Sequence, residues 1–425
     1  MVAESDRAQP RGGSTSVSVI DAARQLVMKA GVALRAIPKV FAILGAACDP
    51  FASVPSASGT KWWLQRLGLF ALSEPLDRAA DWAYLIDHSV QIGTTKVCVI
   101  VGLRLSEWPV PSRPLCHEDV RLLGLIPTDH SSGEIVAQQL EAVAQRTGIP
   151  RQIVHDHGSD VKKGSELFAA RQVDTVLVYD AAHHGACVLK RRFEADARWP
   201  EFLSRLSQTK SRLQQTAEAY LLSPSLRPKA RYMNLAPVLR WARRILALMD
   251  RENAEGSTSG RAQARYGWLR EFRAAIAHWS RVEATVRRGV EFVRSRGLSR
   301  ECDSALARVW RSRPAWERHQ ALEVEWVQFV REQSAPARPH EVLVGSTEVL
   351  ESVFGKWKNL ERQESQSGIT RLVLSLGALL GPWTKSRITT ALEQTPVKHV
   401  LRWCERHLPP SVQSQRRLAF ATSTP

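Results

Sequence analysis

The order of apolar segments between residues 82 and 195 constrains the fold of this chain more than any other feature. Three strand-like runs come first, WAYLIDHSVQ, TKVCVIVGLRL and DVRLLGLIP, with a turn at Gly93 between the first two. GEIVAQQLEAVAQRTG then has helical spacing and ends in Gly148. Two strand–helix pairs follow: QIVHD with KKGSELFAAR, and DTVLVYD with AAHHGACVLKRRFEA. This β-β-β-α-β-α-β-α order predicts an α/β fold with a mixed sheet and helices on both faces.

Helical segments flank the predicted sheet. Residues 17–44 have the pattern helix, turn at Gly31, helix, which is the outline of a helix-turn-helix or of an ordinary helical hairpin. In the first case Arg35 and Lys39 would face DNA, although Pro38 counts against a regular second helix. From residue 199 to about residue 338 the chain is helical, basic and rich in tryptophan, and most of these tryptophans have core-like spacing. Two of them are also candidates for stacking on an unpaired base, Trp316 and Trp326.

These patterns predict six segments along the chain. They are a disordered tail (1–14), a helical DNA-binding module (15–78), the first part of the α/β core (79–195), an all-helical insertion (196–340), the completion of the core (341–365) and a C-terminal helical segment with a basic tail (366–425).

The net charge points to a polyanionic partner. Lys and Arg number 59 against 42 Asp and Glu, a formal charge of +17. No apolar run reaches the roughly 20 residues that span a bilayer, and the N-terminus lacks the apolar centre of a signal peptide. We therefore expect nucleic acid rather than a membrane. The six cysteines have no C-x-x-C spacing, which argues against a zinc finger or disulfide framework and fits a reducing compartment.

Three acidic residues stand where a metal site is expected. Asp87 lies on or at the end of the first predicted strand, Asp156 directly follows the fourth, and Glu351 lies on a helix after the tryptophan-rich segment. Carboxylate oxygens suit Mg²⁺, and two such ions about 4 Å apart assist phosphodiester displacement. Asp160 is the alternative to Asp156, and otherwise caps the helix that begins near Val161. Glu348, one helical turn away, is the alternative to Glu351.

At these positions the chain resembles the DDE transposases of bacterial insertion sequences. The likeness is to the group whose ribonuclease H-like core is split by an insertion before its last acidic residue. HDHGSDV matches that group's D-x-x-x-D run after a strand, with Asp156 first and Asp160 second. The group's third acid opens an E-x-x-F pattern with Trp-Lys at the sixth and seventh positions after it. Here these residues are Glu351, Phe354, Trp357 and Lys358.

The chain also departs from the family pattern. The tyrosine and arginine that the family carries before the glutamate are Val344 and Thr347 here, and the insertion is helical where the family's is often β-rich. The resemblance covers roughly residues 80–362 by the order of elements.

The resemblance implies a DNA transposase. Asp87, Asp156 and Glu351 would hold two Mg²⁺ ions, with Mn²⁺ as a substitute, and Lys358 would grip the phosphate beside the cleaved bond. Activated water would cut double-stranded transposon ends, and the freed 3′-OH would then attack target DNA. The family also implies a dimer or larger assembly, in the bacterial cytoplasm at the nucleoid.

Other interpretations remain open at this level. One is a non-catalytic DNA-binding protein derived from such an enzyme, and another is a different nuclease on the same fold, such as a junction resolvase. Lys162 and Lys163, at a helix start, either contact DNA phosphates or lie on a solvated face. The histidine-rich stretches HDH and AAHHG suggest the alternative of a transition-metal hydrolase. HDH, however, lacks the H-x-x-x-H spacing of a helical metal site.

Overall fold

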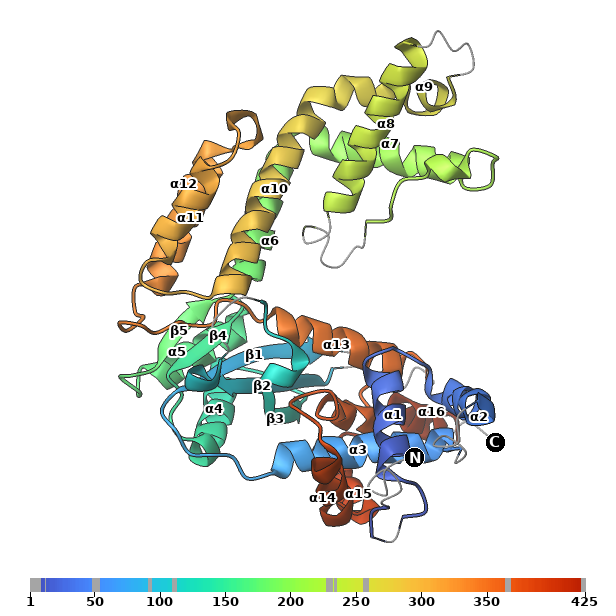
Figure 1. Ribbon diagram of the computed structural model, residues 1–425, viewed down its shortest axis with the longest axis vertical. Helices are drawn as coiled ribbons and strands as arrows, with labels where there is room; N and C mark the ends of the chain where they lie inside the picture. The colour runs from blue at the N-terminus through green and yellow to red at the C-terminus, as the bar shows by residue number, and fades with distance from the viewer. Residues whose placement is uncertain are drawn as a thin grey trace. The chain divides into compact units, whose positions relative to one another are not determined.

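The protein divides into two compact units. The computed structural model describes residues 9–11, 13–47, 54–90, 94–108, 113–226, 232, 235–254, 260–363 and 368–421. The first unit contains Met1–Val178 and Ser346–Pro425, and the second contains Tyr179–Gly345 (Figure 1). The predicted turn at Gly93, the thiol of Cys48 and most of the predicted tail 1–14 lie outside the described residues. None of the described helices is long and apolar enough to cross a membrane.

A five-stranded mixed sheet forms the centre of the first unit, as the order of apolar segments predicts. Its strand order is β3-β2-β1-β4-β5. Strand β1 pairs antiparallel with β2 and parallel with β4, and β2 pairs antiparallel with β3. The strands are β1 (Trp82–Val90), β2 (Lys96–Arg104), β3 (Arg121–Thr128), β4 (Gln152–His155) and β5 (Val176–Tyr179).

Helices α4 (Gly133–Thr147) and α5 (Ser159–Ala169) cover one face of this sheet. They pack closely because glycine stands at their crossing: a Cβ added to Gly164 would lie 2.8 Å from the carbonyl oxygen of Gly133. The core beneath them takes its side chains from alternate strand residues, as the two-residue period of a strand requires. From β1 these are Trp82, Tyr84 and Ile86.

The opposite face of the sheet receives the other side chains of β1. Ala83 and Leu85 are fully buried yet do not belong to the core beneath α4 and α5. Helix α13 (Glu348–Glu361) packs against β1, and none of its described residues joins that core either. Helix α13 therefore lies on the face to which Ala83 and Leu85 point.

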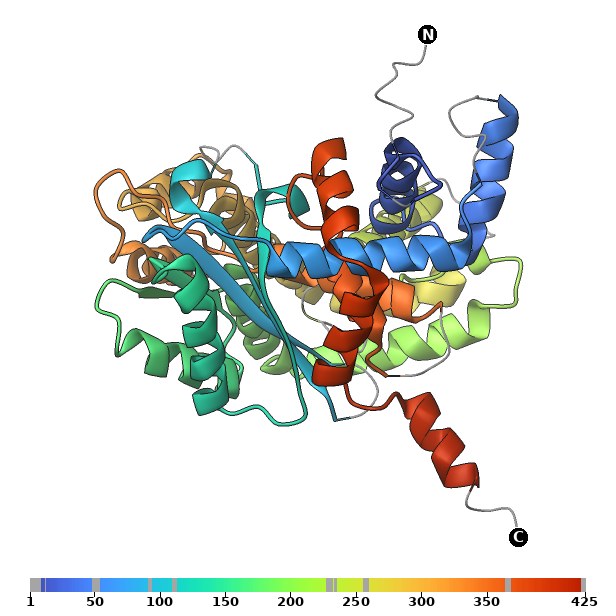
Figure 2. The ribbon, with the colours of Figure 1, turned by 90° about the horizontal axis from the view of Figure 1, so that it is seen from below.

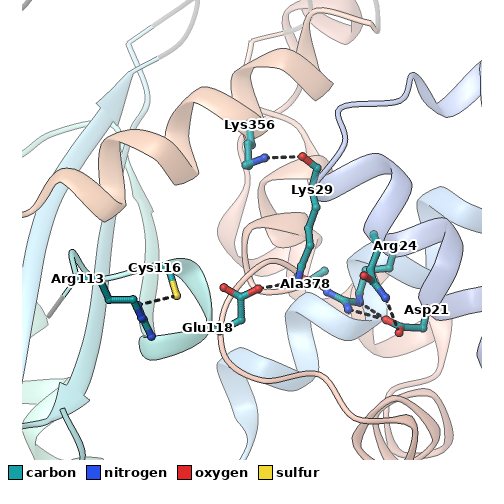
Figure 3. A network of polar contacts seen from close by, with 9 residues as sticks. Asp21, Arg24, Lys29, Arg113, Cys116, Glu118, Lys356 and Ala378 are labelled. Carbon is teal, nitrogen blue, oxygen red and sulfur yellow. Dashed lines mark hydrogen bonds and ion pairs between the residues drawn. The ribbon is translucent and has the colours of Figure 1, made fainter. Parts of the chain in front are cut away.

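The N-terminal helices α1 (Val17–Met28), α2 (Ile37–Ala47) and α3 (Ala57–Ser73) belong to the same unit as the sheet. Arg24 pairs with Asp21 at 2.5 Å and donates to the carbonyl of Ala378 at 3.2 Å (Figure 3). Lys29 pairs with Glu118 at 2.6 Å, and its carbonyl accepts a hydrogen bond from Lys356 at 2.9 Å. These contacts fasten α1 to the segment before β3 and to α13.

Helices α1 and α2 are joined by a turn at Gly31, which has the positive φ of 72° that glycine tolerates. The expectation that Pro38 disturbs the second helix is wrong. Helix α2 begins at Ile37, so Pro38 lies in its first turn, where no hydrogen bond to its missing N–H is required.

The C-terminal segment adds a buried turn and three helices. The turn η10 (Arg371–Leu376) is apolar and packs along α3. Helices α14 (Lys385–Gln394), α15 (Val397–His407) and α16 (Val412–Ala421) follow. Helix α16 lies in the predicted basic tail; it has no buried residue and is set apart from the other helices of its unit (Figure 2).

The second unit is helical, with a core rich in aromatic side chains. Phe193, Trp199, Phe202 and Trp279 contact one another with ring centroids 4.7 to 6.1 Å apart. The helices are α6 (Ala181–Glu194), α7 (Arg198–Leu213), α8 (Ala236–Ala254), α9 (Arg261–Tyr266), α10 (Arg273–Arg296), α11 (Cys302–Arg311) and α12 (Gln320–Ser334), with 3₁₀ turns η6 (Ala219–Leu221), η8 (Gly267–Phe272) and η9 (Ala315–Glu317).

Two features of this unit differ from the expectations. The predicted insertion starts at residue 196, whereas the unit starts at Tyr179, because α6 packs against α10: a Cβ added to Gly185 would lie 2.9 Å from Val290. Trp326 is fully buried, so it cannot stack on a base, while Trp316 is 71% exposed.

Candidate active site

Asp87, within β1, and Asp156, directly after β4, lie side by side on two parallel strands. The register of β1 and β4 pairs Leu85 with Val154 and Ile86 with His155. The next residues in this register are Asp87 and Asp156. Because neighbouring strands lie about 4.8 Å apart, two carboxylates in register are close enough to bind one cation between them.

Both aspartates belong to the face of the sheet that α13 covers. Along β1 the side chains of Tyr84 and Ile86 point towards α4 and α5, so Leu85 and Asp87 point the other way. Ile153 points towards α4 and α5 as well, and the same alternation carried one residue past β4 puts Asp156 with Asp87.

Main-chain groups orient the two carboxylates. Oδ1 of Asp87 accepts a hydrogen bond from the amide of His88 at 2.6 Å. Oδ1 of Asp156 accepts one from the amide of Gly158 at 2.9 Å, which closes a tight turn directly after β4. Both residues are half-buried. A Cβ at position 158 would lie 2.9 Å from that same Oδ1, so a larger residue there would shift the carboxylate of Asp156.

Glu351 lies in the first turn of α13 and is exposed. Phe354 and Trp357 are buried and fix the helix against the core. Lys358 lies over the ring of Phe354, with its Nζ 5.8 Å from the ring centroid. Seven residues is almost two helical turns, so Glu351 and Lys358 share one edge of the helix, as the sequence predicts.

Helix α13 is held in place by contacts on its other edge. His117 Nε2 lies 3.0 Å from Ser352 Oγ, and Lys356 donates to the carbonyl of Lys29.

Glu348, the alternative to Glu351, begins the helix and is half-buried. Glu351 lies on the same edge as Lys358, whereas Glu348 is displaced around the helix axis by about 60° at 100° per residue.

Glu361, at the end of α13, makes the stability of the fold depend on pH. Burial raises the pKa of Glu361 to about 7, against hydrogen bonds from Thr370 and Trp357 that lower it. Because the folded pKa exceeds the unfolded value of 4.5, the protonated carboxyl stabilises the fold at low pH, and this stability is lost as pH rises through about 7.

Replacement of Glu361 by glutamine is expected to remove that loss. Glutamine stays neutral, so the variant and wild type should melt alike near pH 4. At pH 8 the variant should be more stable by up to about 3 kcal/mol, because the pKa of the wild-type carboxyl is about 7 in the folded state and 4.5 in the unfolded state. Thermal melting between pH 4 and pH 8 measures this. Melting curves that stay parallel over the whole range would contradict it.

Asp160, the alternative to Asp156, lies on the other face of the sheet. It occupies the first turn of α5, with its carboxylate 3.5 Å from His88 and 3.3 Å from Lys96. Partial burial raises the pKa of Asp160, but hydrogen bonds from Ser131 and Lys96 and the charge of His88 outweigh it and bring the pKa to about 2. Its carboxylate is therefore already paired with the ammonium group of Lys96 and lies beside the imidazole of His88, whose own pKa is lowered by burial.

The expectation that Asp160 caps a helix beginning near Val161 is wrong. Helix α5 begins at Ser159 and its N-cap is Gly158, because the turn that binds Asp156 starts the helix two residues earlier. Sequence reasoning also missed His88 and Lys96. His88 directly follows Asp87 on β1, and this adjacency could have signalled a second polar residue on the strand, pointing to the other face.

The histidine-rich stretches do not form a metal site in the described part of the chain. His155 is buried with its Nδ1 against the carbonyl of Asp156, and its pKa is lowered chiefly by burial. His157 is exposed, and its ring centroid lies 6.0 Å from that of His155. His184 stacks on Phe329 at 3.9 Å within the second unit, which is a packing role.

The donor chemistry of the aspartate pair fits Mg²⁺, which prefers carboxylate oxygens and retains several waters. Among the described residues, however, no group of three or more His, Cys, Asp or Glu side chains is arranged to hold a metal ion. The structure therefore brings Asp87 and Asp156 together and places Glu351 on a helix that packs against β1, without closing a three-carboxylate cluster.

The predicted DNA contacts are distributed over the first unit. Arg35 and Lys39 are exposed on the turn η2 (Leu34–Ala36) and on α2. Lys162 and Lys163 are exposed in the first half of α5, and Lys162 lies 3.9 Å from Glu166 in a weak surface pair. Lys358 is half-buried and, unlike the other four residues, lies on α13, the helix that carries Glu351.

Comparison with known proteins gives structural likeness at low sequence identity. No family model matches the chain, and no curated protein matches its sequence. Among solved structures the chain is similar to the Drosophila P element transposase strand transfer complex, with 10% sequence identity, a TM-score of 0.40, and coverage of 90% of this chain and 94% of that one. A TM-score at this level does not establish a shared fold.

Proposed function

We propose that the protein is a metal-dependent DNA-cleaving and strand-transferring enzyme of the DDE transposase type, with a ribonuclease H-like core. The observation that carries the proposal is the pair Asp87, within β1, and Asp156, directly after the parallel strand β4, which come next in the register after Ile86 and His155. The E-x-x-F pattern with Trp-Lys on α13, the helix that packs against β1, supports it.

In this proposal the carboxylates of Asp87, Asp156 and Glu351 hold two Mg²⁺ ions, with Mn²⁺ as a substitute. When bound, the ions would supply an activated oxygen nucleophile and would stabilise the oxygen that leaves phosphorus. The hydrogen bonds from His88 and Gly158 orient two of the carboxylates before any ion arrives. Lys358 positions the phosphate, and the exposed basic residues of α2 and α5 hold double-stranded DNA through its backbone.

Strand transfer then follows from the same groups. Hydrolysis at the element end breaks the bond between phosphorus and the 3′-oxygen and leaves a 3′-OH on the element. That hydroxyl attacks a phosphorus of target DNA, which forms a new phosphodiester and breaks the bond between that phosphorus and the target's own 3′-oxygen. The target strand leaves with a free 3′-OH, so the proton lost by the attacking hydroxyl balances the proton gained by the leaving oxygen. Two ends have to be handled together, so we propose a homodimer or larger assembly on DNA, in the bacterial cytoplasm at the nucleoid.

Cleavage of linear DNA that carries the gene's own flanking ends tests the proposal. With Mg²⁺, wild type is expected to nick at the boundary between element and flank, and chelation with EDTA is expected to stop it. If the protein binds these ends and cuts nothing with Mg²⁺ or Mn²⁺, a non-catalytic DNA-binding protein is the better account. Cutting of branched junctions in preference to the ends would favour a junction resolvase.

The third acid is tested by a matched pair of variants on one helix. Glu351→Gln is expected to lower the cleavage rate by at least about 100-fold, because loss of an outer partner of a metal ligand already costs 10- to 100-fold. Glu348→Gln, one turn away, is expected to change the rate by less than about threefold. The reverse order of effects would assign the role to Glu348.

A further inference from the structure

The second unit contains a groove that the proposed cleavage chemistry does not use. It has a volume of about 480 Å³ and lies between α8, α10 and the turn η9. Five arginines line it, against two glutamates, so the lining carries a formal charge of +3. The arginines are Arg240, Arg243, Arg281, Arg287 and Arg288. We call this surface the arginine groove.

Ion pairs inside the groove neutralise only part of this positive charge. Glu283 accepts from Arg287 at 3.2 Å, and Glu317 accepts from Arg288 at 3.1 Å and also from Arg313. Arg240, Arg243 and Arg281 form no ion pair with any residue that the structure describes. The charge of Arg240 still acts on Glu283, whereas Arg243 and Arg281 have no acidic partner among the described residues of the groove. The guanidinium groups of Arg243 and Arg281 are therefore available to an anion, and the net positive charge of the lining favours binding one.

Trp316 gives the groove an aromatic surface. It lies on η9 and is 71% exposed, whereas Trp199, Trp279 and Trp310 of the same unit are at most 3% exposed. Its neighbour Glu317 is held by Arg288 and Arg313, so the turn that carries the indole is fastened to the wall of the groove. An exposed aromatic ring beside arginines is the combination that binds unpaired bases and their phosphates.

The spread of the arginines decides between ligands. Arg281 and Arg288 are seven residues apart on α10, about 10 Å along the helix at 1.5 Å per residue. Arg240 and Arg243 lie on α8, another wall of the groove. A lone phosphate would use one of these positions, and a duplex would keep its bases stacked away from Trp316. An unpaired strand uses all of them.

We propose that the arginine groove binds single-stranded nucleic acid, with successive phosphates on the arginines and one base stacked on Trp316. The site goes beyond the proposed cleavage function and does not depend on it. Its sequence preference would be weak, because stacking and backbone contacts read no base edges.

Fluorescence anisotropy of a labelled 20-residue oligo(dT), with the full-length protein and no divalent metal, tests the proposal. Trp316→Ala is expected to weaken binding about 10-fold, and Trp316→Phe is expected to retain most of the affinity. The double variant Arg240→Gln, Arg243→Gln is expected to reduce the slope of log affinity against log salt by about 1.4, at 0.7 per phosphate contact. Arg244→Gln, next to Arg243 but outside the lining, is the matched control and should bind like wild type.

Photocrosslinking locates the strand independently of affinity. Oligo(dT) in which 5-bromodeoxyuridine replaces several thymidines is expected to crosslink to the peptide that contains Trp316. The proposal is overturned if crosslinks fall only in the first unit, if both groove variants bind oligo(dT) like wild type, or if Trp316→Ala weakens a duplex of equal length as much as the single strand. Since no cleavage is measured, these outcomes are independent of the proposed catalytic function.

Discussion

Replacement of Asp87 or Asp156 by asparagine is expected to reduce Mg²⁺-dependent cleavage of DNA ends by at least about 100-fold. Asparagine keeps the size of the side chain and the oxygen that accepts from His88 or Gly158, but it removes the negative charge that a divalent ion requires. Binding of the DNA ends should remain or become slightly tighter, because a charge that repels phosphate is lost. Single-turnover cleavage and anisotropy on the same substrate separate the two effects.

Asp160→Asn is the matched control. It changes an aspartate four residues from Asp156, in the same sequence motif, but on the other face of the sheet. Its cost should appear in stability, since the ion pair with Lys96 and the contact with His88 are lost. Because the pKa of Asp160 is lowered to about 2, this stability is present above about pH 4 and is lost as pH falls towards 2. If Asp160→Asn abolishes cleavage and Asp156→Asn does not, the assignment of the site is reversed.

Local pattern was sufficient for the α/β core and insufficient for what surrounds it. The strands and helices between residues 82 and 194 follow the predicted order, because each has a clear period and a clear stop such as Gly148, with its φ of 88°. For Asp87 and Asp156 the sequence predicted only that the two carboxylates lie near each other. Their shared face depends on the register between β1 and β4, which is set by long-range packing that the sequence does not display.

The surroundings of the site depend on contacts between distant segments. His88, Lys96 and Asp160 come from three elements, and no spacing relates them. The buried turn η10 passed unnoticed because a short apolar run has no diagnostic period. The arginine groove combines residues of α8 and α10 with Trp316, more than 70 residues from Arg240, so that only the folded unit makes it a surface.

Gly68→Ala is expected to lower the free energy of unfolding of the first unit by at least about 3 kcal/mol. Within a helix this change normally stabilises by up to about 1 kcal/mol. Here a Cβ on Gly68 would overlap the carbonyl group of Leu374, where η10 crosses α3, and main chain cannot move aside as a flexible side chain can. At 2–4 °C per kcal/mol, the melting temperature should fall by about 6–12 °C.

Gly355→Ala provides the comparison that isolates this crossing. Gly355 also lies within a helix, α13, but nothing comes within 4 Å of a Cβ added there. The same substitution should therefore raise stability by up to about 1 kcal/mol through helix propensity alone. Opposite signs for the two variants in calorimetry would show that the close approach of α3 and η10 fixes glycine at position 68. Equal, small effects would mean that this approach is looser than the structure places it, and with it the support that η10 gives to α13 through Thr370 and Glu361.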